Sequence, residues 1–147
     1  MELHGTPEQR AYAKEYVDLV LAQRHGVVFY SFEDAERRDD ATIFKVPSNC
    51  VGYVTGRGGS ALRSIEEEFG ALMIFVKDES QRGQPGSQDR DADSEMLLIF
   101  GPMRARCGAK LKVLSAIEHK LNGEYCRDGR IEDADKLFGE FNVIYLI

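Results

Sequence analysis

The sequence predicts one mixed α+β domain, and three observations lead to this fold class. The chain has 147 residues, which is the size of a single ordinary domain. Hydrophobic residues make up 43% of it and charged residues 30%, proportions typical of a globular protein with a packed core. Between residues 41 and 123 the hydrophobic pattern changes in the order strand, helix, helix, strand, strand, helix.

The N-terminal part of the chain is predicted to contain a helix, a strand-like run and a linker. Thr6, Pro7 and Gln9 indicate a helix start, because Thr6 can cap the first turn, Pro7 fits it and Gln9 completes a capping box. Apolar residues at helical spacing follow. Residues 27–32 are typical of a strand, and the charged residues 33–40 are predicted to form an acidic linker.

The central part of the chain carries the strand and helix pattern. Strands are predicted at residues 42–46, 71–76 and 95–100, and helices at residues 48–55, 60–69 and 101–121. In the second of these helices, Leu62, Ile65 and Phe69 share one side, as expected for a helix that packs on a core. Residues 77–94 have no periodic apolar pattern and are predicted to form a long loop.

The most informative stretch is residues 46–71, which read VPSNCVGYVTGRGGSALRSIEEEFGA. With its Val46-Pro47 start, its Gly56-Arg57-Gly58-Gly59 turn and its Gly70-Ala71 end before an apolar strand, it resembles the K-homology (KH) domain of RNA-binding proteins in the eukaryotic type I form. The resemblance covers about residues 41–123. It implies a three-stranded antiparallel sheet with three helices packed on one face, to which this chain adds an N-terminal helix and a C-terminal extension.

The glycine-rich turn has a physical reason to bind a nucleic-acid backbone. Glycine adopts positive φ angles and lets a sugar-phosphate chain approach closely. The helix that starts after the turn directs free N–H groups and a positive partial charge toward phosphates, and Arg57 adds a full charge. The resemblance implies that this loop clamps about four unpaired nucleotides of single-stranded RNA, with single-stranded DNA left open as a second ligand.

The resemblance also implies a groove in which the bases lie. One wall is the first helix with the loop, and the other is the strand after the second helix with the long loop. The predicted binding residues are Val51, Gly52, Val54, Thr55, Gly56, Arg57, Gly58, Gly59, Ser60, Arg63, Met73, Phe75, Lys77 and Arg82. Thr55 departs from the Ile or Val that is usual before the first loop glycine, which leaves the preference of the groove open.

An enzyme is a remote alternative. Residues 56–61 fit the Gly-x-Gly-x-x-Ala pattern of a dinucleotide-binding unit, and Asp78 follows near the end of a strand. The segment before Gly56 contains Gly52 and Thr55 and is a poor buried strand, so a dinucleotide-binding enzyme fragment is the least favoured interpretation. No catalytic arrangement is evident, and we expect a non-catalytic protein without a cofactor.

The cysteines and the apolar runs bear on compartment and on metals. The chain has three cysteines (Cys50, Cys107 and Cys126) without a Cys-x-x-Cys pair, which favours reduced thiols over a disulfide framework or a metal site. We therefore expect an intracellular protein, cytoplasmic or nuclear. No apolar run is long enough to cross a membrane, and no membrane partner is predicted.

The charge is distributed unevenly along the chain. The whole chain has a net charge of −6, but residues 1–40 carry −4, residues 41–123 carry +1 and residues 124–147 carry −3. The acidity therefore belongs to the flanks, and the part with the RNA motif is close to neutral. Modest binding by a single module is expected, because charge contributes little.

Weak internal similarity raises the idea of a tandem array. Residues 5–17 match residues 101–113 at an offset of 96, and residues 140–147 share the apolar pattern of residues 40–47. Residues 1–40 could then be the tail of a preceding KH unit, with the KH domain at 41–123 and the start of a further unit at 124–147. Neighbouring KH units or protein partners remain open, and so does a role in post-transcriptional regulation.

A protein-interaction or scaffold module with weak or no RNA binding is the main alternative function. The strand-like flanks, residues 27–32 and 141–147, could add edge strands for this purpose. Other clusters are predicted to be structural. Glu66, Glu67 and Glu68 are expected on a solvated helix face, Tyr12 and Tyr16 in a core, and Arg104, Arg106, Lys110 and Lys112 on the exposed side of the last helix.

Overall fold

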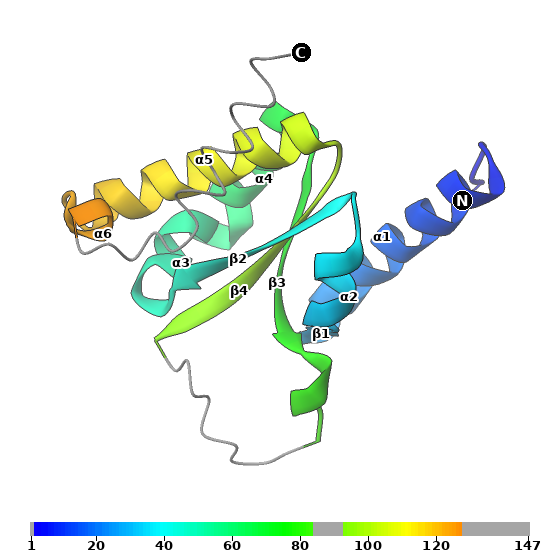
Figure 1. The fold of residues 1–147 in the computed structure, drawn as a ribbon, viewed down its shortest axis with the longest axis horizontal. Helices are drawn as coiled ribbons and strands as arrows, with labels where there is room; N and C mark the ends of the chain where they lie inside the picture. The colour runs from blue at the N-terminus through cyan, green and yellow to red at the C-terminus, as the bar shows by residue number, and fades with distance from the viewer. Residues whose placement is uncertain (1, 84–92, 128–147) are drawn as a thin grey trace.

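Figure 1 shows the fold in a computed structural model, which describes residues 2–83 and 93–127. A twisted sheet in the centre lies between two layers of helices. Its strands are β1 (Val28–Tyr30), β2 (Ala41–Pro47), β3 (Leu72–Asp78) and β4 (Ser94–Phe100). The α-helices are α1 (Pro7–His25), α2 (Phe32–Arg37), α3 (Ser48–Thr55), α4 (Ser60–Phe69), α5 (Met103–Lys120) and α6 (Glu124–Arg127), and two short 3₁₀ turns are η1 (Arg57–Gly59) and η2 (Glu79–Gln81).

The sheet has four strands in the order β1-β3-β4-β2. β4 pairs antiparallel with β2 and with β3, while β1 pairs parallel with the end of β3, where Val28 lies opposite Val76. The predicted sheet was thus one strand short. Residues 27–32 supply this strand, as the edge-strand prediction anticipated, because the outer edge of β3 offers backbone groups that need partners.

The predicted order of strands and helices in the central region is confirmed. Helices α3, α4 and α5 pack on one face of the sheet around a core that includes Val54, Ile65, Met73, Val113 and Ile117. Pro47 ends β2, and the chain turns directly into α3. Gly70 takes a left-handed conformation with φ of 68° and ends α4 before β3 begins. This layer brings the end of α3 and the start of α4 together at the glycine-rich turn.

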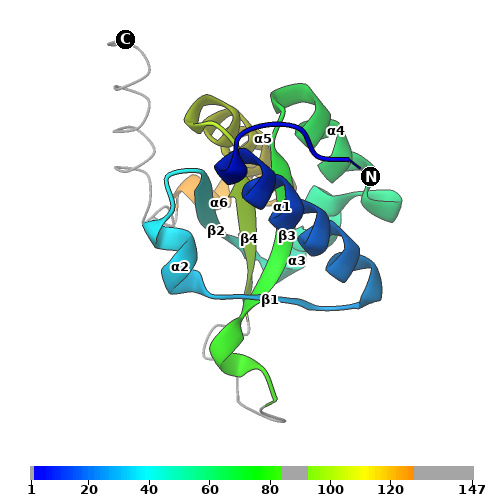
Figure 2. The same cartoon turned by 90° about the vertical axis from the view of Figure 1, so that its right-hand side faces the viewer.

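Helix α1 covers the opposite face of the sheet, as Figure 2 shows. Its start follows the prediction, since the Thr6 side chain accepts a hydrogen bond from the Gln9 N–H and Gln9 completes the capping box. Tyr16 and Leu19 of α1 pack on a second core of buried sheet residues that includes Leu98 and Phe100. The N-terminal helix is therefore an integral layer of the described fold.

The predicted linker at residues 33–40 is corrected by the structure, which places helix α2 there. Ser31 caps this helix through a hydrogen bond from the Asp34 N–H, and the single buried residue Ala35 fixes it to the sheet. Phe32 at the start of the helix packs against the same core, but a six-residue helix is too short to show a periodic apolar pattern, so its charged sequence resembled a connector.

A part-buried polar cluster joins α1 to the segment after α2. The Arg38 guanidinium donates to both carboxylate oxygens of Asp40 at 2.7 Å and to Glu15 at 2.7 and 2.8 Å. The Tyr16 hydroxyl donates to Asp40 at 2.6 Å, and the Tyr30 hydroxyl donates to Glu15 at 3.0 Å. These bonds lower the pKa of Asp40, chiefly through Arg38, while burial raises the pKa of Tyr16.

Two basic residues of α5 were predicted on its exposed side, but the structure places them in the interior. Arg106 and Lys110 are buried, with 7% and 4% of their surface exposed. Arg106 donates to the carbonyl of Ala41 at 2.8 Å and also to the carbonyls of Asp39 and Gly101. The carbonyls of Asp39 and Ala41 at the start of β2 can satisfy a buried guanidinium, but only the tertiary structure brings them to α5.

One predicted edge strand lies outside the described part of the chain. Residues 141–147, for which an edge strand was predicted, lie outside the described residues. Within residues 2–83 and 93–127, no helix combines the length and the apolar character required to cross a bilayer.

Candidate nucleic-acid interface

The glycine-rich turn joins α3 to α4, and its first glycine is required by two constraints. Gly56 has φ of 72°, a value that other residues rarely adopt. A Cβ atom at Gly56 would also lie 2.6 Å from the Cβ of Ala61 and 2.8 Å from its backbone nitrogen. The Gly56 N–H donates to the carbonyl of Gly52 at 3.0 Å, which closes α3. The close approach of the two helices therefore depends on glycine here.

The next part of the turn is open to solvent. Gly58 and Gly59 have φ of 58° and 79°, and nothing lies within 4 Å of a Cβ atom built at Gly58. Arg57 at the tip is exposed. The Arg63 side chain on α4 donates from Nη2 to the Gly58 carbonyl at 2.7 Å, and this bond fixes the turn to α4. Arg63 is thus a positioning residue for the loop as well as a source of positive charge.

The first turn of α4 faces the same region. Gly59 stands at its N-cap position, and no side chain caps the helix there. The N–H groups of the first turn, which begins at the exposed Ser60, have no partner within the helix, and that of Ser60 donates to the carbonyl of Arg57. The positive end of the helix dipole and the exposed Arg57 therefore act on the same side of the loop.

One of the four α3 residues predicted for the first wall is buried in the core. Gly52 is exposed, and a Cβ atom built there would meet nothing within 4 Å, while Val51 and Thr55 are partly buried. Val54 is only 1% exposed and belongs to the core. Val54 cannot line an open groove, because the helical repeat turns it toward the sheet.

Of the β3 residues predicted for the second wall, Met73 is likewise buried in the core. Met73 is 1% exposed and packs in the core, whereas Phe75 is partly buried against that core and Lys77 is exposed. All three side chains share one face of the strand. Met73 lies deepest because the chain enters the core there after the end of α4. Of these three side chains, only those of Phe75 and Lys77 remain accessible.

The chain matches a known protein family over the region that contains the turn, α3 and β3. A family model described as KH domain matches residues 41–116. The chain belongs to the KH domain family. Far upstream element-binding protein 2 of Homo sapiens is 27% identical over 128 residues, which cover 85% of this chain and 17% of that protein.

Two further relatives show how much of each protein is shared. Far upstream element-binding protein 1 of Homo sapiens is 26% identical over 115 residues, which cover 78% of this chain and 16% of that protein. Polyribonucleotide nucleotidyltransferase of Chlorobium chlorochromatii is 46% identical over 37 residues, which cover 25% of this chain and 5% of that protein. The KH chain thus spans about one sixth of the length of the far upstream element-binding proteins that it matches.

The KH surface includes one residue that the sequence analysis assigned to a solvated face. Glu66 on α4 is partly buried, and its Oε1 accepts a hydrogen bond from the Met73 N–H at 2.8 Å. Burial raises the pKa of this carboxyl above its usual range. Glu66 follows Ile65 and lies four residues after Leu62, so its place at the border of the apolar helix face was the available signal.

Arg82 follows η2 and contacts an aromatic residue of β1. Its guanidinium lies 5.3 Å from the centre of the Phe29 ring of β1, and it forms an ion pair with Glu79 at 3.0 Å. Arg82 was predicted in the groove wall as part of the long loop, and its contact with β1 was not anticipated.

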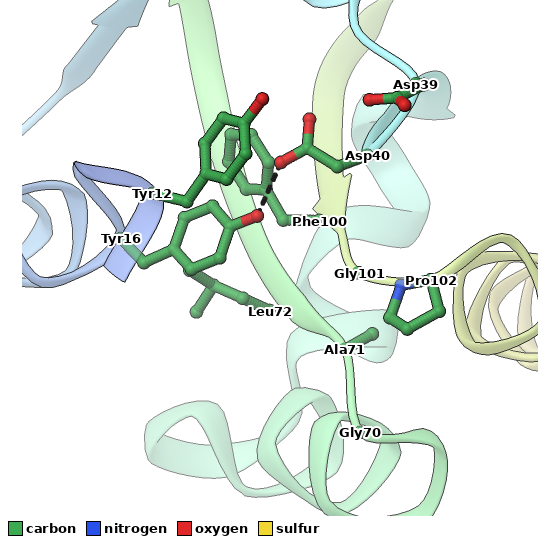
Figure 3. A pocket seen from close by; sticks show the side chains of 10 residues that line it. All are labelled: Tyr12, Tyr16, Asp39, Asp40, Gly70, Ala71, Leu72, Phe100, Gly101 and Pro102. Atoms are coloured by element: carbon green, nitrogen blue, oxygen red, sulfur yellow. Dashed lines mark hydrogen bonds between the residues drawn. The ribbon is translucent and has the colours of Figure 1, made fainter. Parts of the chain in front are cut away.

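A cavity of about 640 Å³ lies elsewhere, between α1 and the end of β4 that is followed by Pro102 (Figure 3). Tyr12, Tyr16 and Phe100 line it, together with Asp40. The Arg38 guanidinium already lies 5.1 Å from the centres of the Tyr12 and Phe100 rings. This cavity belongs to the contact between α1 and the sheet, and none of the glycine-rich turn lines it.

Proposed function

We propose that this KH domain binds about four nucleotides of single-stranded RNA without catalysing a reaction. The phosphates lie against Gly56, Gly58, Gly59 and the first turn of α4, and the bases lie between α3 and the accessible side chains of β3. The observation that carries the proposal is the open turn with three positive-φ glycines beside an uncapped helix N-terminus.

The charges of the surface support modest binding. Arg57 and Arg63 are the basic residues of the turn and its support, and residues 41–123 together carry a charge of only +1. Each phosphate that is neutralised lowers the logarithm of the binding constant by roughly 0.7 per tenfold increase in salt for a single strand. We therefore expect a shallow salt dependence, with backbone hydrogen bonds and apolar contacts supplying most of the affinity.

We propose that residues 1–40 belong to the same binding unit as the KH domain. Supporting this, α1 covers one face of the sheet and β1 pairs with β3. These contacts occupy surfaces that a scaffold module would use for partners, which favours RNA binding over the scaffold alternative. Tight binding then requires further modules on a longer chain, because linked modules raise the effective concentration of each other.

The test compares two charge changes of equal size. Arg57→Asp combined with Gly58→Asp places two acids on the turn, and Arg104→Asp combined with Ser115→Asp makes the same charge change on exposed positions of α5. We expect the first pair to weaken binding to random-sequence single-stranded RNA at least tenfold and the second to change it less than about twofold. Thermal unfolding followed by circular dichroism checks that both variants are folded.

Two outcomes decide between RNA binding and the scaffold alternative. Undiminished RNA binding by a folded turn variant would sink the proposed function. No RNA binding by the unchanged protein, together with self-association in light scattering, would favour the scaffold alternative. A single-stranded DNA of matching sequence, measured in parallel, shows whether the 2′-hydroxyl contributes to recognition.

A further inference from the structure

Strand β1 places additional side chains next to the groove. It pairs in parallel with the last residues of β3, and Phe29 lies opposite Lys77. β1 lies outside the residues that match the KH family model. Its contribution is therefore not part of the region that matches the family model.

The direction of the Phe29 side chain follows from the two cores. Val28 and Tyr30 both belong to the core beneath α1. Because successive residues of a strand point to opposite faces, the Phe29 side chain leaves β1 toward the other face, which Phe75 shares with α3, α4 and α5. Lys77, two residues after Phe75 and opposite Phe29, lies on this face too. Phe75, Lys77 and Phe29 thus follow one another on one face. Phe29 and Arg82 also line a hollow beside α1, together with Lys14 and Asp18, so they lie at the outer edge of the sheet.

Arg82 completes the cluster from the turn after β3. Its guanidinium lies 5.3 Å from the Phe29 ring centre, and its side chain is 64% exposed. Phe29 is partly buried and Lys77 is exposed. The neighbouring acids have other contacts: Glu79 pairs with Arg82 at 3.0 Å, and Asp78 accepts from the Ser80 N–H at 2.8 Å. With two acids beside two bases the cluster is close to neutral, so stacking dominates over charge.

We propose that Phe29, Lys77 and Arg82 form a stacking platform for one additional base of the same single strand, beyond the nucleotides held in the groove. An aromatic ring paired with a guanidinium binds the face of any base, and an exposed ammonium reaches the neighbouring phosphate. Phe75 and Lys77 are roughly 7 Å apart along β3, a short step from the groove wall to the platform. The inference rests on the proposed function, since it extends the site of the same strand.

The first test uses the absence of tryptophan from the chain. Phe29→Trp creates a single fluorescent reporter at the platform, and Tyr12→Trp creates a matched reporter on α1, where the Tyr12 side chain is exposed. Random-sequence RNA of about eight nucleotides should quench the platform reporter, whereas RNA of about four nucleotides should fill the groove and leave that reporter unquenched. The fluorescence of the reporter on α1 should respond to neither RNA.

The second test measures affinity with two independent variants. Phe29→Leu keeps an apolar side chain but removes the ring, and Arg82→Gln removes the guanidinium without touching β1. Each should weaken binding of the longer RNA about tenfold and leave the shorter RNA unchanged. Arg10→Gln, an exposed change on α1 of the same kind as Arg82→Gln, should alter neither affinity.

The outcomes separate the platform from the proposed function. If neither RNA binds the unchanged protein, the proposed function fails. If both RNAs bind with equal affinity, and Phe29→Leu and Arg82→Gln leave the longer one unaffected, the platform is overturned and the groove remains. Hydrogen exchange at residues 28–30 tests whether β1 stays paired in the Phe29→Leu variant. If β1 does not stay paired, the affinity of the Arg82→Gln variant decides whether the platform exists.

Discussion

The two faces of the sheet are closed by different forces. Helices α3, α4 and α5 cover one face through a continuous apolar core, in which Val113 and Ile117 have no exposed surface. Helix α1 covers the other face without a single fully buried residue of its own. Its contact depends on part-buried side chains such as Leu19 and on the charged hydrogen bonds around Arg38.

This difference indicates how the parts of the binding surface respond to conditions. The glycine-rich turn and α3 rest on the apolar core, whose stability depends little on pH or salt. Strand β1 lies beside α1, whose contact with the sheet contains ion pairs that salt and acid weaken. The turn should therefore persist under conditions that loosen the N-terminal segment.

The largest expected difference comes from equivalent truncations on the two faces. Ile117→Ala leaves a cavity in the closed core and should lower the free energy of unfolding by about 3 kcal/mol. Leu19→Ala removes a partly exposed side chain, and we expect a loss of about 1 kcal/mol. Urea unfolding followed by circular dichroism measures both values. Equal losses would show that the two faces are packed alike and would contradict the comparison.

Removal of one guanidinium tests the charged cluster. Arg38→Gln breaks the hydrogen bonds to Asp40 and Glu15 and leaves their two carboxylates without this counterion. It should cost about 2 kcal/mol of unfolding free energy. Arg37→Gln is the control, since the exposed Arg37 pairs with Glu33 on the same helix face and its loss should cost less than about 0.5 kcal/mol. If Arg37→Gln lowered the free energy of unfolding as much as Arg38→Gln, the cluster would have no special role in stability.

The pH dependence of the α1 face follows from Asp40. Its pKa is lowered in the folded protein, chiefly by the hydrogen bond from Arg38, so the folded state favours the ionised form. The stability that Asp40 contributes is present above its unfolded pKa of about 3.9 and is lost as the pH falls through the lower folded value. Urea unfolding at a series of pH values below about 5 should show this loss, and Asp40→Asn should make the profile flatter.

The smallest expected effect has the opposite sign and concerns the groove face. Burial raises the pKa of Glu66, so the folded state favours the protonated form, and stability is lost as the pH rises through the raised value. Glu66→Gln keeps an acceptor for the Met73 N–H and should stabilise the protein slightly near neutral pH, with no gain in acid. Glu67→Gln, at an exposed neighbouring position, should change nothing. A stabilisation that persists in acid would contradict this explanation.

The outcome for individual elements shows which patterns are sufficient for prediction. α4 was predicted at its observed bounds because its apolar side and its flanking glycines are local signals. α2 was missed because a charged helix of six residues is too short to carry such a signal. Along the predicted walls, Val54 and Met73 were assigned to the groove although they belong to the core. Glu66 was assigned to solvent although it contacts β3, because its contact depends on how α4 lies against the strand.

By itself the sequence determined the parts of the protein that depend on neighbouring residues. The positive φ angles of the turn require glycine, and the start of α1 and the apolar side of α4 follow from spacing alone. Only the tertiary structure decided that β1 joins β3, that α1 closes the second face and that Phe29 meets Arg82. These contacts join residues tens of positions apart, and local periodicity has no information about which distant partner satisfies an edge strand, a guanidinium or a ring.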